Sequence, residues 1–156
     1  FRFGLAVIGK HDSGHHVPAI RRHSDMVTNF VPADEFLEYL QAMQLMDDGG
    51  IEPSIDATMW SMDGSYPFAW GPTSQKVIIL MTDEVAQTIT GKNVSQVNLH
   101  AVDNGYQIFV FALPEHHNSF LQMVRGEQNR LYTPTANSET VFLQIKQIFE
   151  DLCLGE

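Results

Sequence analysis

The sequence predicts an α/β fold built on a mainly parallel sheet, and two observations support this prediction. Residues 77–81 and 106–113 are short apolar runs with almost no polar break. Such runs are typical of strands that are buried on both faces of a parallel sheet. Segments with helical periodicity alternate with them, as in layered α/β proteins. The length of 156 residues suits one domain with a single sizeable core.

The charge balance limits the classes of partner. Nine basic against nineteen acidic residues give a net charge of -10, which disfavours nucleic acid and anionic membranes and suits cations or basic protein surfaces. No apolar run approaches the roughly 20 residues of a membrane span. Because the chain opens at Phe1 rather than Met, we expect a fragment of a longer polypeptide. The single cysteine, Cys153, excludes an internal disulfide, and we expect its thiol to be buried on the last helix.

The first third of the chain predicts two strands and a loop. Residues 1–8 are apolar apart from one arginine and predict a strand, and residues 20–30 predict a short edge strand. The polar loop between them, residues 9–18, contains side chains that can bind metal, but their spacing matches no zinc pattern. We therefore interpret it as a solvated loop. The side chains concerned are His11, Asp12, His15 and His16.

A helix is predicted from Pro32 and Asp34 onward, because apolar residues recur there at helical spacing. We expect this stripe to face the core, and the helix to end at residues 47–50, where two glycines allow positive φ. The stripe consists of Phe36, Leu37, Leu40, Met43 and Met46.

A second helix follows at residues 53–62. Pro53 suits its first turn, and Ile55, Met59 and Met62 lie on one face. Glu52 therefore lies in the turn just ahead of a helix, where the helix dipole favours a carboxylate. In the loop at residues 63–74, we expect two aromatic side chains, Phe68 and Trp70, to cover the core; the alternative is an exposed binding patch.

The strand at residues 77–81 ends abruptly in Thr82, Asp83 and Glu84. In open α/β sheets, ligands bind at the carboxyl ends of the strands. Asp83 is thus a candidate binding residue. The alternative is an aspartate that only caps the following turn or helix.

The remaining elements continue the alternation. Residues 95–104 predict a helix with Val97, Ala101 and Val102 facing inward, and residues 114–125 predict a short helix with three packed residues. These are Phe120, Leu121 and Val124. Asn93-Val94-Ser95 is a glycosylation triplet that slightly favours an extracellular protein.

The end of the chain predicts a last strand at residues 131–133 and a final helix that begins at Asn137 or Ser138. Its apolar face consists of Val141, Ile145, Ile148, Phe149 and Leu152.

The order of these pieces resembles the von Willebrand factor A domain, and most closely the I-like domain of integrin β subunits. Residues 3–9 resemble that family's second strand, and residues 49–57 resemble its second metal loop and the helix after it. Residues 77–83 resemble its central strand ending in Thr-Asp, and residues 107–113 its next strand. The resemblance covers nearly the whole chain. It implies a Rossmann-like open sheet, mostly parallel, with helices on both faces.

The resemblance also implies a function. The family binds Mg²⁺, or else Mn²⁺ or Ca²⁺, in a metal-ion-dependent adhesion site at the top of the sheet. A carboxylate from a protein ligand completes the coordination, which suits a hard cation. Asp83 matches the aspartate that closes the central strand, and Glu52 matches the glutamate of the second loop. Asp47 lines up with a residue that helps to hold a neighbouring calcium, but Gly49 replaces an aspartate there.

One departure from the family is large. Its first strand ends in Asp-x-Ser-x-Ser, the main metal loop, and a helix follows; Asp12-Ser13 is no substitute, because it comes after the second strand. Residues 1–156 therefore resemble a von Willebrand factor A-like domain that lacks the first strand and first helix. We expect a further chain or segment to supply that strand, since its absence leaves strand edges unpaired.

These residues and this resemblance lead to three candidate functions. The first is a non-enzymatic adhesion or protein-recognition domain, outside the cell or at its surface, that binds a protein ligand through a divalent cation held by Glu52 and Asp83. The second is a degenerate, metal-free domain with a structural or interaction role. The third is a metal-dependent hydrolase using Asp83 with His100 or His116, although the common hydrolase motifs are absent.

Overall fold

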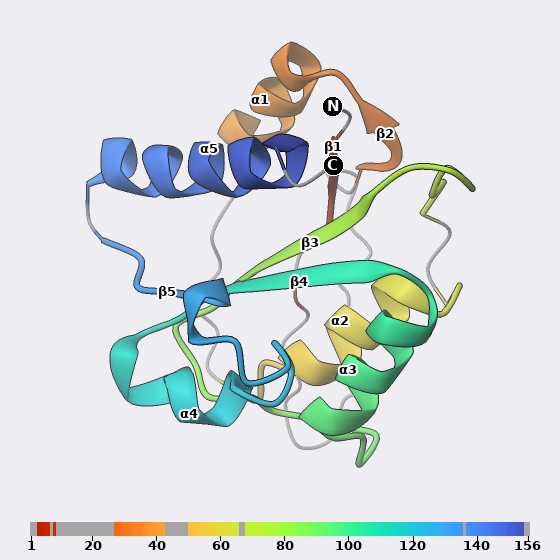
Figure 1. The fold of residues 1–156 in the computed structure, drawn as a ribbon, viewed down its shortest axis with the longest axis vertical. Coiled ribbons are helices and arrows are strands. Elements are labelled where there is room, and N and C mark those ends of the chain that lie inside the picture. Colours follow the sequence, from red (N-terminus) through yellow and green to blue (C-terminus); the bar gives the residue numbers. More distant parts are fainter. Residues whose placement is uncertain are drawn as a thin grey trace.

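Three parallel strands form the centre of the fold in this computed structural model (Figure 1). Their order is β3 (Lys76–Met81), β4 (Tyr106–Phe111) and β5 (Leu131–Tyr132). β3 and β4 pair in continuous register from Lys76 opposite Tyr106 to Met81 opposite Phe111. The residues that the structure describes are 3–6, 8, 27–42, 50–65, 68–135 and 137–154.

Helices cover both faces of this sheet, so the prediction of an α/β fold with a parallel sheet is confirmed. On one face lie α2 (Ser54–Met62) and α3 (Val94–Asp103), and on the other lies α5 (Ser138–Leu154) (Figure 1). The two faces alternate along the strands, as the pleat requires. The face under α2 and α3 buries Leu80, Ile108, Val110, Ile55, Met59, Met62, Val97 and Ala101.

The opposite face is packed by the final helix. Phe109 and Phe111 of β4 are buried there against Ile148, in the middle of α5. The partly buried side chains around them include the predicted apolar face of that helix, which is therefore confirmed. They are Val77, Ile79, Tyr132, Val141, Ile145 and Leu152.

A second, two-stranded sheet lies beside α5. β1 (Phe3–Leu5) pairs antiparallel with β2 (Val27–Val31), and α1 (Ala33–Ala42) follows. The ring of Phe3 stacks on Phe36 at 5.2 Å between centroids and meets the edge of Phe149 at 5.8 Å. These ring contacts attach the small sheet and α1 to the final helix.

An aromatic cluster links the two sheets near the start of β4. Trp70 contacts Phe30 of β2 at 4.7 Å and Tyr106 of β4 at 5.2 Å between ring centroids, and its indole N–H donates to the carbonyl of Ser61 at 2.8 Å. Phe68 packs against Trp70 and Phe30. The prediction that Phe68 and Trp70 cover the core is confirmed.

The prediction that residues 77–81 are buried on both faces is wrong in part. Only Leu80 is fully buried, and Met81 is 49% exposed. The reason is the place of β3 in the sheet: among the described residues it pairs along one edge only, with β4. β4 has neighbours on both edges, and it matches the expectation of a buried strand.

Among the described residues, three side chains predicted to face the core are exposed: Leu37 of α1, Val102 of α3 and Cys153 of α5. Each lies on the same helix as correctly predicted core residues but is turned away from them by the 3.6-residue period. In α3, for example, Val97 and Ala101 point inward, and Val102 is one residue further around the helix. Apolar residues therefore extend beyond the buried face in these helices.

Shorter elements complete the described chain. η1 (Pro114–His116) and α4 (His117–Phe120) follow β4, and η2 (Gln128–Arg130) leads into β5. Phe120 and Val124 are buried as predicted. The predictions for residues 9–18, 20–26 and 43–49 lie outside the described residues. Within the described part of the chain, no helix is both long and apolar enough to span a membrane.

Candidate functional site

The candidate site lies at the carboxyl ends of β3 and β4, together with residues 82–90; we call this the carboxyl edge. The backbone N–H of Thr82 donates to the carbonyl of Phe111 at 3.0 Å, which extends the pairing of the two strands by one step. Beyond Thr82 the chain leaves the sheet and runs toward α2 and α4. The edge is thus formed where a rigid strand pair becomes a loop.

Asp83 is the first residue of this loop, and its side chain is exposed. The turn itself is capped by the neighbouring Thr82, whose hydroxyl accepts the N–H of Glu84 at 3.1 Å. Among the described residues, no hydrogen bond or ion pair engages the Asp83 carboxylate. The alternative role considered for Asp83, capping the turn, is therefore performed by Thr82.

Two hydrogen bonds hold residues 82–90 against the first turn of α2. The N–H of Ile55 donates to the carbonyl of Gln87 at 3.0 Å, and the N–H of Gln87 donates to the side-chain hydroxyl of Ser54 at 3.4 Å. Ser54 and Ile55 are both buried. Because Ser54 follows Glu52 by only two residues, the loop that carries Asp83 and the turn that carries Glu52 lie side by side.

A buried carboxylate strengthens this joint. Asp56, in the first turn of α2, is 0% exposed and accepts the N–H of Ile89 at 2.7 Å as well as the hydroxyl of Thr90. A buried charge is costly unless hydrogen bonds satisfy it, and here two donors do so. Sequence reasoning missed this residue, because an aspartate in a first helical turn is equally explained by the helix dipole.

The other side of the loop is attached to α4. The N–H of Ala86 donates to the hydroxyl of Ser119 at 3.0 Å, and that hydroxyl donates to the carbonyl of His116 at 2.7 Å. The loop is thus held on one side by α2 and on the other by α4. Such double attachment suits a segment that must present side chains in a fixed position.

Glu52 lies in the turn that was predicted for it. Gly50 has a φ of 111°, a left-handed conformation that favours glycine, and α2 begins at Ser54. Glu52 is half-buried, and its carbonyl accepts the N–H of Ser54 at 2.7 Å. A further carboxylate, Glu84, is also half-buried and accepts a hydrogen bond from the side-chain amide of Gln87 at 3.4 Å.

The donor set can be tested against a hard divalent cation. Carboxylate oxygens are the ligands that Mg²⁺ prefers, and it keeps several waters when proteins supply few ligands. Among the described residues, no three histidine, cysteine, aspartate or glutamate side chains gather closely enough to hold a metal. Glu52 and Asp83 fit the chemistry of Mg²⁺, but they leave most coordination positions to water, backbone or an incoming carboxylate.

The two histidines considered for a hydrolase do not engage Asp83. His100 lies on α3, and its Nε2 is buried without a hydrogen-bond partner among the described residues. His116 is the last residue of η1, and its carbonyl accepts the hydroxyl of Ser119, the residue that attaches the loop to α4. Within the described part of the chain, neither histidine forms a hydrogen bond or ion pair with the Asp83 carboxylate.

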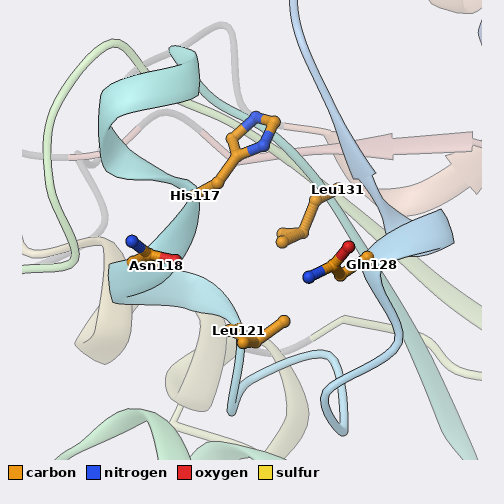
Figure 2. Close-up of a pocket in the computed structure, with 5 residues that line it drawn as sticks. All are labelled: His117, Asn118, Leu121, Gln128 and Leu131. Atoms are coloured by element: carbon orange, nitrogen blue, oxygen red, sulfur yellow. The ribbon is translucent and has the colours of Figure 1, made fainter.

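A separate hollow of about 230 Å³ lies between α4 and the start of β5. Figure 2 shows Leu121, Gln128 and Leu131 turned toward one another, with His117 and Asn118 on the α4 side. Nε2 of His117 lies 3.0 Å from the carbonyl of Ala112, which can only accept. Nε2 therefore carries a hydrogen, and in the neutral ring Nδ1 is left as an acceptor.

Comparison with known proteins gives a limited result. No protein-family model matches the chain, and no curated protein matches it. Among solved structures, proximal thread matrix protein 1 from the mussel byssus is similar, with a TM-score of 0.54 and 19% sequence identity. The likeness covers 71% of this chain and 28% of the mussel protein. At this identity it shows a shared fold alone.

Proposed function

We propose that this chain is a protein-recognition domain of the von Willebrand factor A type, similar to the I-like domain of integrin β subunits. Support for this finer class comes from the order of its elements: a parallel β3–β4–β5 sheet with helices on both faces and a polar loop at the carboxyl edge. The domain acts outside the cell or at its surface. It is not an enzyme.

In this proposal, Glu52 and Asp83 bind a divalent cation, Mg²⁺ or else Mn²⁺ or Ca²⁺, and a carboxylate of the protein ligand completes its coordination. The observation that carries the proposal is the joint between Gln87 and the residues Ser54 and Ile55, which places the two loops side by side. A cation also suits the net charge of -10, since a bound divalent ion offsets local repulsion between carboxylates.

A further strand belongs to this proposal. β3 pairs along one edge only among the described residues, and an open strand edge can pair with another segment. In a von Willebrand factor A domain, the strand carrying the main metal loop takes that position. We infer that a further chain or segment supplies it here, together with the remaining metal ligands.

The test is thermal unfolding of the chain with Mg²⁺, with Mn²⁺ and with EDTA. A cation at about 100 times its dissociation constant adds about 2.7 kcal/mol to the free energy of unfolding, which raises the melting temperature by several degrees. Glu52→Gln and Asp83→Asn should each reduce this shift. Asp63→Asn is the matched control, because Asp63 is a carboxylate that caps α2 at the end opposite Glu52 and pairs with Lys92.

A melting temperature that is indifferent to both cations and to EDTA contradicts the metal site. The second candidate, a metal-free interaction module of the same fold, then remains. The observation that favours it is the lack of a cluster of three metal-binding side chains among the described residues. The two candidates differ in a direct way: the metal-free module binds its protein partner equally well in Mg²⁺ and in EDTA.

A further inference from the structure

The triplet Asn93-Val94-Ser95 lies at the start of α3. Asn93 is extended, with φ −130° and ψ 166°, and caps the helix. Its Oδ1 accepts the N–H of Gln96 at 3.0 Å, and its own backbone N–H donates to Oε1 of Gln96 at 2.9 Å. This reciprocal arrangement is a capping box, so the side chain of Asn93 has a fixed orientation.

The cap determines which atom of the Asn93 amide faces solvent. A backbone N–H can only donate, so the atom that meets the N–H of Gln96 must be the carbonyl oxygen. The amide nitrogen, Nδ2, then lies on the other side of the group. Asn93 is exposed, and Nδ2 has no hydrogen-bond partner among the described residues. Space is also open at Gly91, where an added Cβ would meet nothing within 4 Å.

The other two residues of the triplet leave Asn93 accessible. Val94 is half-buried and packs on the core below α3, which directs the neighbouring polar side chains outward. Ser95 is exposed, and its hydroxyl donates to Oε1 of Gln122 at 2.6 Å in a surface contact. The triplet occurs once in the sequence, so one glycan per chain is the most it can accept.

We propose that Asn93 is an N-glycosylation site, an inference that rests on the extracellular location proposed above. The donor is an oligosaccharide linked to a polyprenyl pyrophosphate. A bond forms between Nδ2 and C1 of the first sugar, the bond between C1 and the pyrophosphate oxygen breaks, and Nδ2 loses one proton. The carbonyl oxygen takes no part, so the glycan and the helix cap are compatible.

The test is expression of the chain behind a cleavable signal peptide in eukaryotic cells. Intact mass is measured before and after treatment with a peptide N-glycosidase, both in the medium and in the cell lysate, so that poor secretion does not hide modification. We expect a glycan on the unaltered chain and on Ser95→Thr. Asn93→Asp and Ser95→Ala should carry none. An unmodified chain in both pools overturns the proposal, as does a glycan that persists in Ser95→Ala.

Asn93→Asp is a suitable variant because aspartate caps helices about as well as asparagine. A second measurement tests the geometry: hydrogen exchange at the backbone N–H of Gln96 should be equally slow with and without the glycan. Faster exchange in the glycosylated chain contradicts the cap-compatible arrangement. Cation binding is measured separately on unglycosylated Asn93→Asp, so failure of the glycan and failure of the metal site are distinguishable.

Discussion

The two strands of the β3–β4 pair are covered to different degrees. In β4, Ile108 and Val110 on one face and Phe111 on the other are almost completely enclosed. In β3, Leu80 is buried, but Val77, Ile78 and Ile79 stay half-buried. The difference follows from the order of the sheet, because β4 pairs along both edges and β3, among the described residues, along one edge only.

The first prediction compares one substitution in the two strands. Ile108→Ala should lower the free energy of unfolding by about 2–5 kcal/mol, because Ile108 is enclosed and its truncation leaves a cavity. Ile79→Ala should cost about 1 kcal/mol, since a half-buried side chain loses less transfer energy. Chemical denaturation of both variants gives the comparison. Equal losses would mean that β3 is as tightly packed as β4.

The second prediction compares two aspartates, Asp56 in the first turn of α2 and Asp63 at its C-terminal cap. Asp56→Ala should cost about 1–3 kcal/mol, because it leaves the N–H of Ile89 and the hydroxyl of Thr90 without their acceptor. Asp63→Ala should cost less than about 1 kcal/mol, since Asp63 makes a partly exposed ion pair with Lys92 at 3.9 Å and accepts one exposed hydrogen bond, from the N–H of Ser65.

Urea denaturation measures both aspartate variants, and cation titration of Asp56→Ala adds a second result. If Asp56 holds residues 82–90 in place, this variant should bind cations more weakly although it removes no proposed ligand. If Asp56→Ala loses stability but binds cations as tightly as the unaltered chain, the contacts of Asp56 support the fold and not the metal site.

The third and smallest effect is expected at alkaline pH, and each face provides one tyrosine for it. Burial raises the pKa of Tyr106 above its ordinary value of 10.0. Burial also raises the pKa of Tyr132, the carboxylate of Asp151 raises it further, and Arg130 acts in the opposite direction. Both phenols should therefore ionise late in a titration followed by tyrosinate absorbance.

The raised pKa values also predict how stability depends on pH. Just above pH 10 the unfolded chain has lost a phenolic proton that the folded chain keeps, so the free energy of unfolding falls as pH rises through this range. Tyr106→Phe should make that fall shallower. Denaturation series at neutral and alkaline pH measure the slope, and an unaltered slope would contradict the assignment.

Much of the fold could be predicted from the sequence where a pattern had only one physical explanation. The spacing of Ile55, Met59 and Met62 requires a buried helical face, and the structure buries all three. The length and composition of residues 106–113 predict a buried strand, and β4 is buried along nearly its whole length. β3 has a similar composition but lies at the edge of the described sheet, and no local pattern distinguishes an edge strand from a central one.

The position of the candidate site could be predicted from the sequence, but the hydrogen bonds that hold residues 82–90 in place could not. Asp83 lies at the carboxyl end of β3, as expected from the abrupt end of an apolar run. Its attachment depends on contacts between segments more than 30 residues apart, such as that between Asp56 and Ile89. A single sequence contains no local signal for such a pair. Leu37 and Val102 were predicted to face the core but are exposed. Apolar periodicity does not show how much of a helix surface its neighbours cover.

The spacing of these contacts along the chain has a consequence for folding. β3 pairs with β4 at a separation of 30 residues, from Lys76 opposite Tyr106 onward, and α2 meets residues 87–90 at a similar separation, as between Asp56 and Ile89. The entropy lost on closing a loop depends only weakly on its length, so neither set of contacts has an advantage from chain spacing. We therefore expect the parallel strand pair and the support of the carboxyl edge to form together, so that the candidate site is assembled with the sheet that carries it.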